Sequence, residues 1–254
     1  MKSVLLTLVT INYNNAEGLR RTLQSLKGVI SDEVESLIID GNSTDGSKDE
    51  IAARLNESIY SRALIESDTG IYDAMNKGMD RASGDIVCFL NADDQYAHPQ
   101  VLSRVVTQMQ DLNLDALMGD VGFFHKEAPT QILRRYRSGR FLPSRLAWGW
   151  MPAHPALFLS RTVVKRVGLF RTDYRIAGDF EYIVRVFHGH DLRYRHLPEV
   201  LVHMQMGGVS TNGWRSKFLL NREVLRACRE NGLQTNMLKI LSKYPVKFLE
   251  LLQK

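Results

Sequence analysis

Residues 86–96 constrain the fold of this chain most strongly, because a buried strand gives way to a polar loop within a few residues. Ile86–Leu90 form a continuous apolar run, which is typical of a central parallel strand that is covered on both faces. The run is followed by Asn91, Asp93 and Asp94. Since ligands of open α/β sheets bind at the carboxyl ends of the strands, we expect these side chains to face a ligand crevice.

A divalent metal site is one interpretation of this polar edge. Mg²⁺ and Mn²⁺ prefer oxygen ligands, and a cation that is shared with substrate phosphates needs only one or two carboxylates from the protein. The alternative is a turn rich in Asn and Asp that caps a helix near His98, because these side chains also favour turns and helix N-termini. Both interpretations fit the stretch taken by itself.

The composition is that of an ordinary globular protein. With 254 residues, of which 44% are hydrophobic and 24% charged, the chain can bury a large core. Cys88 and Cys228 lack the spacing of a metal or redox pair and indicate core residues in a reducing compartment. The apolar run Val4–Thr10 is short and lacks a small-residue cleavage site, so it predicts a first strand rather than a signal peptide. We expect a cytoplasmic protein.

Strands and helices are expected to alternate in the first part of the chain. The strands are Val4–Thr10, Val34–Asp40, Ala63–Glu66 and Ile86–Leu90, and the helices are Glu17–Lys27, Ser47–Leu55 and Ile71–Ala82. This alternation implies right-handed crossovers, and it predicts an α/β fold with a doubly wound, mostly parallel sheet flanked by helices.

Later elements are less clearly periodic. Strands are expected at Ala116–Phe124, Gln131–Tyr136, Ala156–Leu159, Leu192–His196 and Val200–Met204, and helices at Pro99–Leu112, Asp179–His188, 214–230 and 235–252. The net charge of +5 falls mostly in the last 41 residues. We therefore divide the chain into one domain over residues 1–212 and a basic, amphipathic helical extension over residues 213–254.

Four short motifs each follow a predicted strand. They are Thr10–Asn14, Ile39–Gly46, Asp68–Gly78 and Leu90–Asp94. Their order and spacing resemble those of the family 2 glycosyltransferases, inverting enzymes with the GT-A fold that transfer a sugar from a nucleotide sugar to an acceptor. The Asp68–Gly78 segment is similar to that of bacterial exopolysaccharide and colanic-acid-type transferases. The resemblance spans about residues 3–211.

The resemblance implies a set of contacts to the nucleotide. Thr10 and Tyr13 would line the nucleobase, with the ring of Tyr13 as a stacking face. Asp40 would accept a hydrogen bond from the imide of uracil or thymine, which favours a UDP-linked donor. Asp68 would lie beside the diphosphate and ribose, with Lys77 near the phosphate charge. Without a nucleotide, Tyr13 would only pack on the edge of the sheet, and Asp40 would only cap its turn.

The segment Asn91-Ala92-Asp93 occupies the position of the DxD motif of this family. The resemblance assigns metal ligation to Asp93, with Asp94 in support, and it places Asn91 and Ala92 at the ribose and the nucleotide sugar. The cation would be Mg²⁺ or Mn²⁺, which neutralises charge on the departing nucleoside diphosphate.

Inversion at the anomeric carbon needs one carboxylate that takes the proton of the acceptor hydroxyl. Ala177–Glu181 opens a predicted helix and matches this element of the family. We assign the base to Asp179, because a helix N-terminus favours an ionised carboxylate. The alternative is that Asp179 is a helix N-cap and that Glu181 is a solvated side chain.

Contacts to the acceptor or to phosphate are expected from two further segments. His154 precedes a predicted strand and could reach either group, although a histidine between two prolines is equally often structural. Gly208 lies in Gly207–Thr211, which resembles a loop that closes over the diphosphate with backbone N–H groups.

Basic residues point to an anionic acceptor or surface. Arg135 and Arg137 belong to an arginine cluster that either binds the pyrophosphate of a polyprenyl-linked acceptor or is a solvated face. Lys239, Lys243 and Lys247 recur every four residues beside apolar residues, which is typical of a helix that rests on an anionic membrane. Packing of this helix on the main domain is the alternative.

Together these features predict a metal-dependent, inverting hexosyltransferase on the cytoplasmic face of the inner membrane. Its acceptor would be a saccharide or a polyprenyl-diphosphate-linked sugar of bacterial surface polysaccharide. A sugar-nucleotide pyrophosphorylase is one alternative, but Thr10–Gly18 lacks the Gly-rich basic signature of those enzymes. An inactive nucleotide- or nucleic-acid-binding module is another, since Met75, Asn91 and Gln205 depart from common family patterns. No nucleic-acid motif is present, so no nucleic-acid partner is expected.

Overall fold

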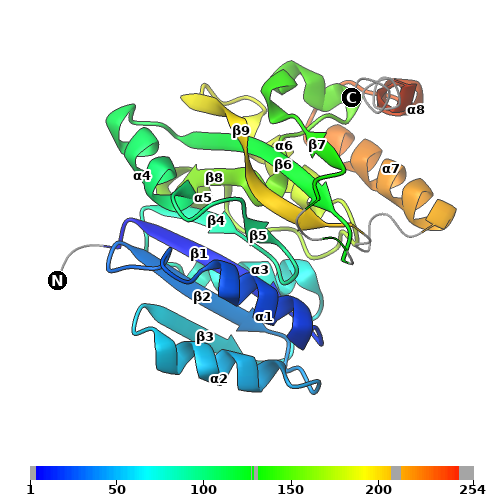
Figure 1. Ribbon diagram of the computed structural model, residues 1–254. Coiled ribbons are helices and arrows are strands. Elements are labelled where there is room, and N and C mark those ends of the chain that lie inside the picture. The colour runs from blue at the N-terminus through cyan, green and yellow to red at the C-terminus, as the bar shows by residue number, and fades with distance from the viewer. Residues whose placement is uncertain (1–3, 127, 129–130, 207–212, 246–254) are drawn as a thin grey trace.

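The protein is a nine-stranded sheet with helices on both faces (Figure 1). The computed structural model describes residues 4–126, 128, 131–206 and 213–245. The strands are β1 Leu6–Asn12, β2 Val34–Asp40, β3 Ser61–Ile65, β4 Ile86–Phe89, β5 Gln95–Tyr96, β6 Ala116–Phe124, β7 Arg134–Tyr136, β8 Leu157–Ser160 and β9 Tyr194–Gln205. The α-helices are α1 Ala16–Ser25, α2 Ser47–Glu57, α3 Ile71–Arg81, α4 Val101–Asp111, α5 Arg161–Val167, α6 Gly178–Phe187, α7 Gly213–Glu230 and α8 Met237–Leu241. Three 3₁₀ turns are η1 Ser138–Arg140, η2 Pro143–Trp148 and η3 His154–Ala156.

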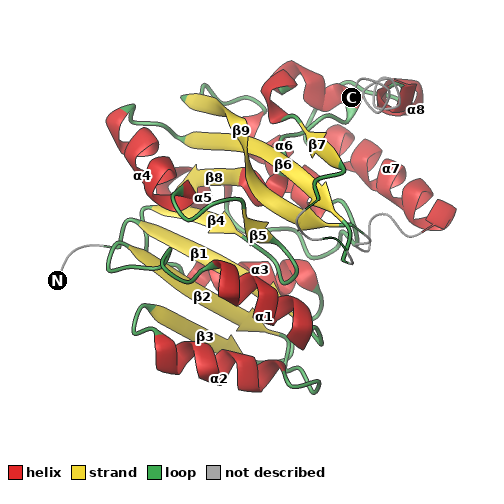
Figure 2. Cartoon of the chain, in the orientation of Figure 1, coloured by secondary structure: helices red, strands yellow, loops and turns green. Residues whose placement is uncertain are grey.

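The first half of the sheet is parallel, in the order β3-β2-β1-β4. Every residue of β1 and β2 is buried, because helices cover both faces of these strands. Helices α1, α2 and α4 cover one face of the sheet, and α3, α5 and α6 cover the other (Figure 2). Their apolar side chains belong to two separate clusters, one on each face. The α/β class and the doubly wound arrangement are therefore confirmed.

The second half of the sheet is mixed. Strand β8 pairs antiparallel with both β4 and β6, and β6 pairs parallel with β9. The two strands expected at 192–196 and 200–204 are one strand, β9, because irregular register opposite Met118–Val121 absorbs Pro198. The short strand β5 and helix α5 were not expected, and the strand expected over 131–136 is confined to β7.

Helix α7 packs against α6. Its side chains Val224, Ala227 and Cys228 are buried in the same apolar cluster as Phe180 and Ile183 of α6. Helix α8 adds Ile240 to this cluster, whereas the remainder of the expected 235–252 helix lies largely outside the described residues. The C-terminal helices thus share the core of the sheet domain.

Candidate functional site

The carboxyl ends of β1 and β2 are joined by one buried polar network. The amide nitrogen of Asn12 donates to Asp40 Oδ2 at 2.7 Å and to Ser47 Oγ at 2.9 Å. Asp40 also accepts from the backbone N–H and the hydroxyl of Ser43 at 2.7 and 2.8 Å. Asp40 is fully buried, so its observed contacts are those of a turn cap, and its contact with a base stays a prediction.

Tyr13 and Asp68 meet over Gly41 where these two strands end. Tyr13 is 65% exposed, and a Cβ atom added to Gly41 would come within 2.8 Å of the Tyr13 ring and 2.6 Å of Asp68 Oδ2. The Tyr13 ring and the Asp68 carboxylate therefore pack directly on the bare backbone of Gly41, which leaves no space for a larger side chain at this position. Thr10 is not part of this edge, because its side chain is fully buried inside β1.

The loop after β4 brings Asp93 to the same edge in a left-handed backbone conformation, with φ of 86°. Both carboxylate oxygens of Asp93 have partners. Asn15 donates to Oδ2 at 2.6 Å, and Arg21 contacts Oδ1 at 2.5 Å. Arg21 also donates to Gln205 Oε1 at 2.8 Å, which ties the loop to the end of β9. Asp93 is thus half-buried and neutralised by a guanidinium.

The neighbours of Asp93 bear on whether a cation fits here. Asn91 Oδ1 is buried and has no hydrogen-bond partner among the described residues, so it is a candidate oxygen ligand two residues before Asp93. Asp94 is buried, and burial together with the Asp93 charge raises its pKa well above the usual range. Among the described residues there is no group of three or more His, Cys, Asp or Glu side chains suited to a metal. The residues fit a cation that takes most of its ligands from a diphosphate.

Asp179 lies in the first turn of α6. Its carboxylate is half-buried and accepts from the backbone N–H of Phe180 at 2.7 Å. Burial raises the pKa of Asp179 to about 6, and the charge of Glu223 adds to the rise. The N-cap is Ala177, and Glu181 is buried in an ion pair with Arg185, so the alternative of an N-cap and a solvated glutamate is wrong.

Tyr72 of α3 connects Asp179 to the rest of the site. Its hydroxyl donates to the carbonyl of Ile176 at 2.7 Å and accepts from the N–H of Gly178 at 2.8 Å. A cavity of about 220 Å³ lies beside it, between residues 69–73 and 172–175. The start of α3, which follows the Asp68 loop, is thereby fixed against the start of α6.

His154 belongs to an aromatic cluster. Its ring stacks on Phe89 at 5.5 Å between centroids and meets Phe170 edge to face at 6.0 Å. Phe170 in turn stacks on Tyr72. Burial lowers the pKa of His154 to about 4, so the ring is neutral at physiological pH. These contacts are structural, and they link the end of β4 to the Tyr72 ring.

The remaining predicted site residues are Lys77, Arg135, Arg137, Ala92 and Gly208. Lys77 donates to the carbonyl of Ser67 at 2.6 Å, and Arg135 pairs with the buried carboxylate of Asp120 at 2.7 Å. Arg137 is exposed beside η1. Ala92 lies at the loop with Asn91 and Asp93, and Gly208 lies outside the described residues. Contacts of these residues with a donor or acceptor stay predictions.

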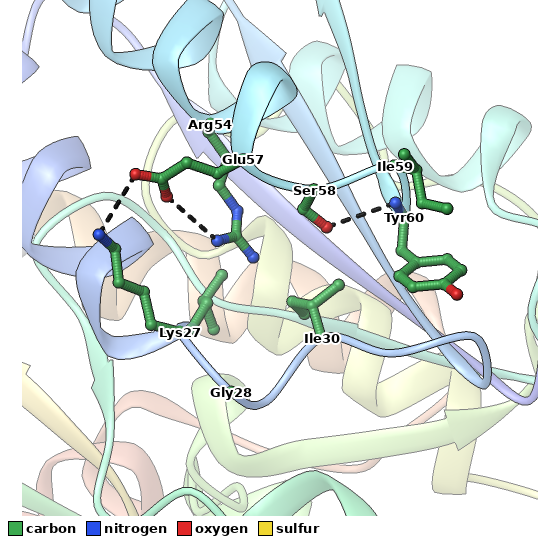
Figure 3. Close-up of a pocket in the computed structure, with 9 residues that line it drawn as sticks. Lys27, Gly28, Ile30, Arg54, Glu57, Ser58, Ile59 and Tyr60 are labelled. Carbon is green, nitrogen blue, oxygen red and sulfur yellow. Dashed lines mark hydrogen bonds and ion pairs between the residues drawn. The ribbon is translucent and has the colours of Figure 1, made fainter.

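A larger cavity, of about 490 Å³, lies away from this site (Figure 3). It is lined by Lys27, Arg54, Glu57, Ile59 and Tyr60, among others, which precede β2 and β3 and so lie at the amino ends of the strands. Lys27 and Arg54 share Glu57 as an ion-pair partner. The polar groups described above lie at the opposite edge of the sheet.

Sequence reasoning missed four residues of the site. Asn15 and Arg21 hold Asp93, and Tyr72 and Glu223 hold the segment before Asp179. Asn15 directly follows a motif, and Tyr72 lies inside one, so both could have been singled out. Arg21 is one of several charged residues on an amphipathic helix, and nothing local distinguishes Glu223.

Two solved structures illustrate this arrangement. TarS of S. aureus, residues 1–349 with UDP-GlcNAc, aligns with a TM-score of 0.70 and 15% identity over 91% of this chain and 68% of that one. A mannosyltransferase of Pyrobaculum calidifontis with GDP-Man and Mn²⁺ aligns with a TM-score of 0.63 and 16% identity over 98% and 81%. The chain spans 40% of a longer TarS structure. The fold is therefore the GT-A fold of glycosyltransferases.

Sequence relatives are named as transferases too. A PGL/p-HBAD biosynthesis glycosyltransferase of Mycobacterium bovis BCG is 30% identical over 86% of this chain and 84% of its own length. An uncharacterized glycosyltransferase of Mycobacterium tuberculosis is 30% identical over 70% and 67%. The profile of glycosyl transferase family 2 matches residues 7–167. The chain belongs to glycosyl transferase family 2.

The raised pKa of Asp179 makes a prediction about stability. A carboxyl group whose pKa is higher in the folded than in the unfolded protein favours folding only while it is protonated, so its ionisation lowers the free energy of unfolding as pH rises from about 4 to about 6. The free energy of unfolding of Asp179→Asn, measured by urea titration, should therefore exceed that of the wild type at pH 7.5 by on the order of 1 to 3 kcal/mol. This difference should shrink at pH 4.5. A difference that is independent of pH would contradict the assignment.

Proposed function

We propose that this chain is an inverting glycosyltransferase that moves a hexosyl group from a nucleotide sugar to an acceptor hydroxyl, with Asp179 as the base. The observation that carries the proposal is the state of Asp179. Its carboxylate has no cationic partner among the described residues, and its pKa of about 6 leaves it ionised yet basic near neutral pH. Such a group is suited to accept a proton from a hydroxyl.

The reaction is a single displacement in this proposal. The acceptor oxygen bonds to the anomeric carbon while the bond from that carbon to the diphosphate oxygen breaks. The proton of the acceptor hydroxyl passes to Asp179. The exposed ring of Tyr13 stacks on the nucleobase, Asp68 lies beside the ribose and diphosphate, and a UDP-linked donor is preferred. The TarS complex, which holds UDP-GlcNAc, shares the fold and supports a nucleotide sugar as donor.

A divalent cation belongs to the proposal. Asp93 and Asn91 would hold Mg²⁺ or Mn²⁺, which neutralises the charge of the departing diphosphate when it is bound. The Mn²⁺ in the Pyrobaculum mannosyltransferase supports this class of cofactor. Arg21 shares the Asp93 carboxylate, so it competes with the cation for Oδ1.

The acceptor is proposed to be a saccharide or a polyprenyl-diphosphate-linked sugar of bacterial surface polysaccharide, met at the cytoplasmic face of the inner membrane.

No helix among the described residues has both the length and the apolarity to cross a bilayer. Peripheral contact is supported by apolar side chains that α7 and α8 expose. Trp214 is 75% exposed with Phe218 one turn further on, and Leu238 is 80% exposed. Aromatic and apolar residues beside basic ones are typical of interfacial helices.

Nucleotide binding provides the first test. We expect calorimetric titration of UDP, GDP and dTDP to show that one nucleotide, UDP, binds and that Mn²⁺ strengthens its binding. Asp93→Ala should remove the effect of Mn²⁺, whereas Asp179→Asn should bind UDP like the wild type and lose transfer or donor hydrolysis by at least about 10²-fold. Normal turnover by Asp179→Asn would refute the assigned base, and absence of binding to all three nucleotides would refute the proposed donor site.

The competition at Asp93 makes a separate prediction. Arg21→Met removes the guanidinium from Asp93 Oδ1, so the variant should bind Mn²⁺ about tenfold more tightly in the absence of nucleotide, as measured by electron paramagnetic resonance of the free ion. Arg20→Met is the matched control, because Arg20 lies next in the chain but pairs with Glu50. Weaker Mn²⁺ binding by Arg21→Met would show that the arginine does not compete with the cation.

Membrane contact can be tested by co-sedimentation with lipid vesicles. The wild type should bind vesicles that contain phosphatidylglycerol more tightly than vesicles of phosphatidylcholine alone, and added salt should weaken this binding. The double variant Trp214→Ser, Phe218→Ser should lose binding about tenfold or more. Ile59→Ser is the control, since Ile59 is even more exposed, at 86%, but lies before β3 at the amino ends of the strands. Equal losses in both variants would contradict the assigned face.

A further inference from the structure

Glu223 of α7 is buried, with 7% exposure, and its carboxylate binds backbone N–H groups. Oε1 accepts from Arg175 at 2.9 Å, and Oε2 accepts from Ile176 at 2.9 Å and from Ala177 at 2.8 Å. No Lys or Arg side chain among the described residues forms an ion pair with it. A buried carboxylate that is satisfied only by consecutive N–H groups fixes the path of the backbone that supplies them.

The segment that Glu223 holds is the one that leads into Asp179. Ala177 is the N-cap residue of α6, and Asp179 follows two residues later. From α3, the Tyr72 hydroxyl bonds the carbonyl of Ile176 and the N–H of Gly178. A Cβ atom added to Gly178 would lie 2.6 Å from the Tyr72 ring, so the chain passes this ring as closely as it can. Residues 175–178 are thus held from two helices.

We infer that Glu223 is a positioning residue for the transfer reaction, which fixes residues 175–177 so that the Asp179 carboxylate meets the acceptor hydroxyl. The inference rests on the proposed role of Asp179 as base. A general base must lie within hydrogen-bond reach of the proton that it takes, and a displacement of about 1 Å costs on the order of 10²-fold in rate. Because Glu223 lies on α7, a helix that follows the family match at residues 7–167 takes part in catalysis.

A role in stability alone is the competing explanation, and the chain contains a matched residue that separates the two. Glu35 of β2 is likewise 7% exposed, and it accepts from the backbone N–H of Ser83 at 2.8 Å, but unlike Glu223 it also pairs with Arg62 at 2.7 Å. It lies near the amino end of its strand, opposite the candidate site. Glu35→Gln should therefore lower stability without affecting turnover, and it serves as the control for Glu223→Gln.

The electrostatic position of Glu223 supplies a second readout. The titratable groups that interact with Asp179 are Tyr72 from α3 and Glu223 from α7. Burial raises the pKa of Tyr72, so the phenol stays protonated. Burial is also the main cause of the raised pKa of Asp179, and the charge of Glu223 adds to the rise. Neutralising Glu223 should move the acidic limb of the pH–rate profile to lower pH. Glu35→Gln should leave that limb in place.

The experiment compares the wild type, Glu223→Gln, Glu223→Asp, Glu35→Gln and Asp179→Asn in the full chain. Mn²⁺-dependent hydrolysis of UDP-GlcNAc, UDP-glucose, UDP-galactose and GDP-mannose gives turnover, and titration with UDP gives donor affinity. For Glu223→Gln we expect a loss of about 10²-fold in kcat, with UDP affinity and donor KM within threefold of the wild type and a pH limb at lower pH. Glu223→Asp keeps the charge but is shorter, so it should lose less.

Hydrogen exchange at residues 175–177 and urea unfolding accompany the kinetics. If Glu223→Gln and Glu35→Gln both keep the kcat of the wild type after correction for the folded fraction, Glu223 acts on stability only and the inference fails. If Glu223→Gln does not fold, Glu223→Asp decides between the same outcomes. Full turnover by Asp179→Asn would instead refute the proposed base, and absence of hydrolysis by the wild type would refute the proposed function. An inactive Asp179→Asn with a normal Glu223→Gln would refute this inference alone.

Discussion

Complete burial of β1 and β2 is the constraint on which the site depends. Helices cover both faces of these strands, so a polar side chain reaches solvent only where a strand ends. Asn12 and Asp40, the last residues of their strands, use this position to fasten the two strand ends to each other. The residues that follow, Tyr13 and Gly41, are then presented on a rigid edge rather than on a free loop. The Tyr13 ring is accessible at this edge because the covered faces of the sheet expose no other part of these two strands.

The first half of the fold could be predicted from the sequence because its signals are local. Continuous apolar runs, glycine-rich turns and amphipathic helices alternate there, and β2 has the expected bounds. The second half could not be predicted as well. A proline at position 198 indicates a break, yet β9 continues through it because β6 accommodates an irregular register. Whether a strand survives such a residue is decided by its partner strand, which the local sequence does not describe.

The candidate site divides in the same way. Tyr13, Asp68, Asp93 and Asp179 stand out because each lies in a motif after a strand or at a helix start. The residues that hold these side chains in place do not stand out in the sequence. Arg21 reaches Asp93 from α1, and Glu223 reaches the start of α6 from a helix 46 residues further along the chain. Such contacts have no periodicity or spacing, and only the packing of α7 on α6 brings Glu223 to its three N–H groups. The burial of Thr10 is likewise set by sheet pairing.

The ion pair of Arg21 with Asp93 affects how any ligand binds at that edge. The carboxylate is already neutralised, and the same guanidinium bonds Gln205 on the far strand of the sheet. A ligand that engages Asp93 therefore exchanges one set of contacts for another instead of adding new ones. The free energy of binding is then the difference between the contacts that the ligand makes and the contacts of Asp93 that it replaces. Arg21 thus leaves no bare charge at Asp93, and through Gln205 it joins α1 to β9.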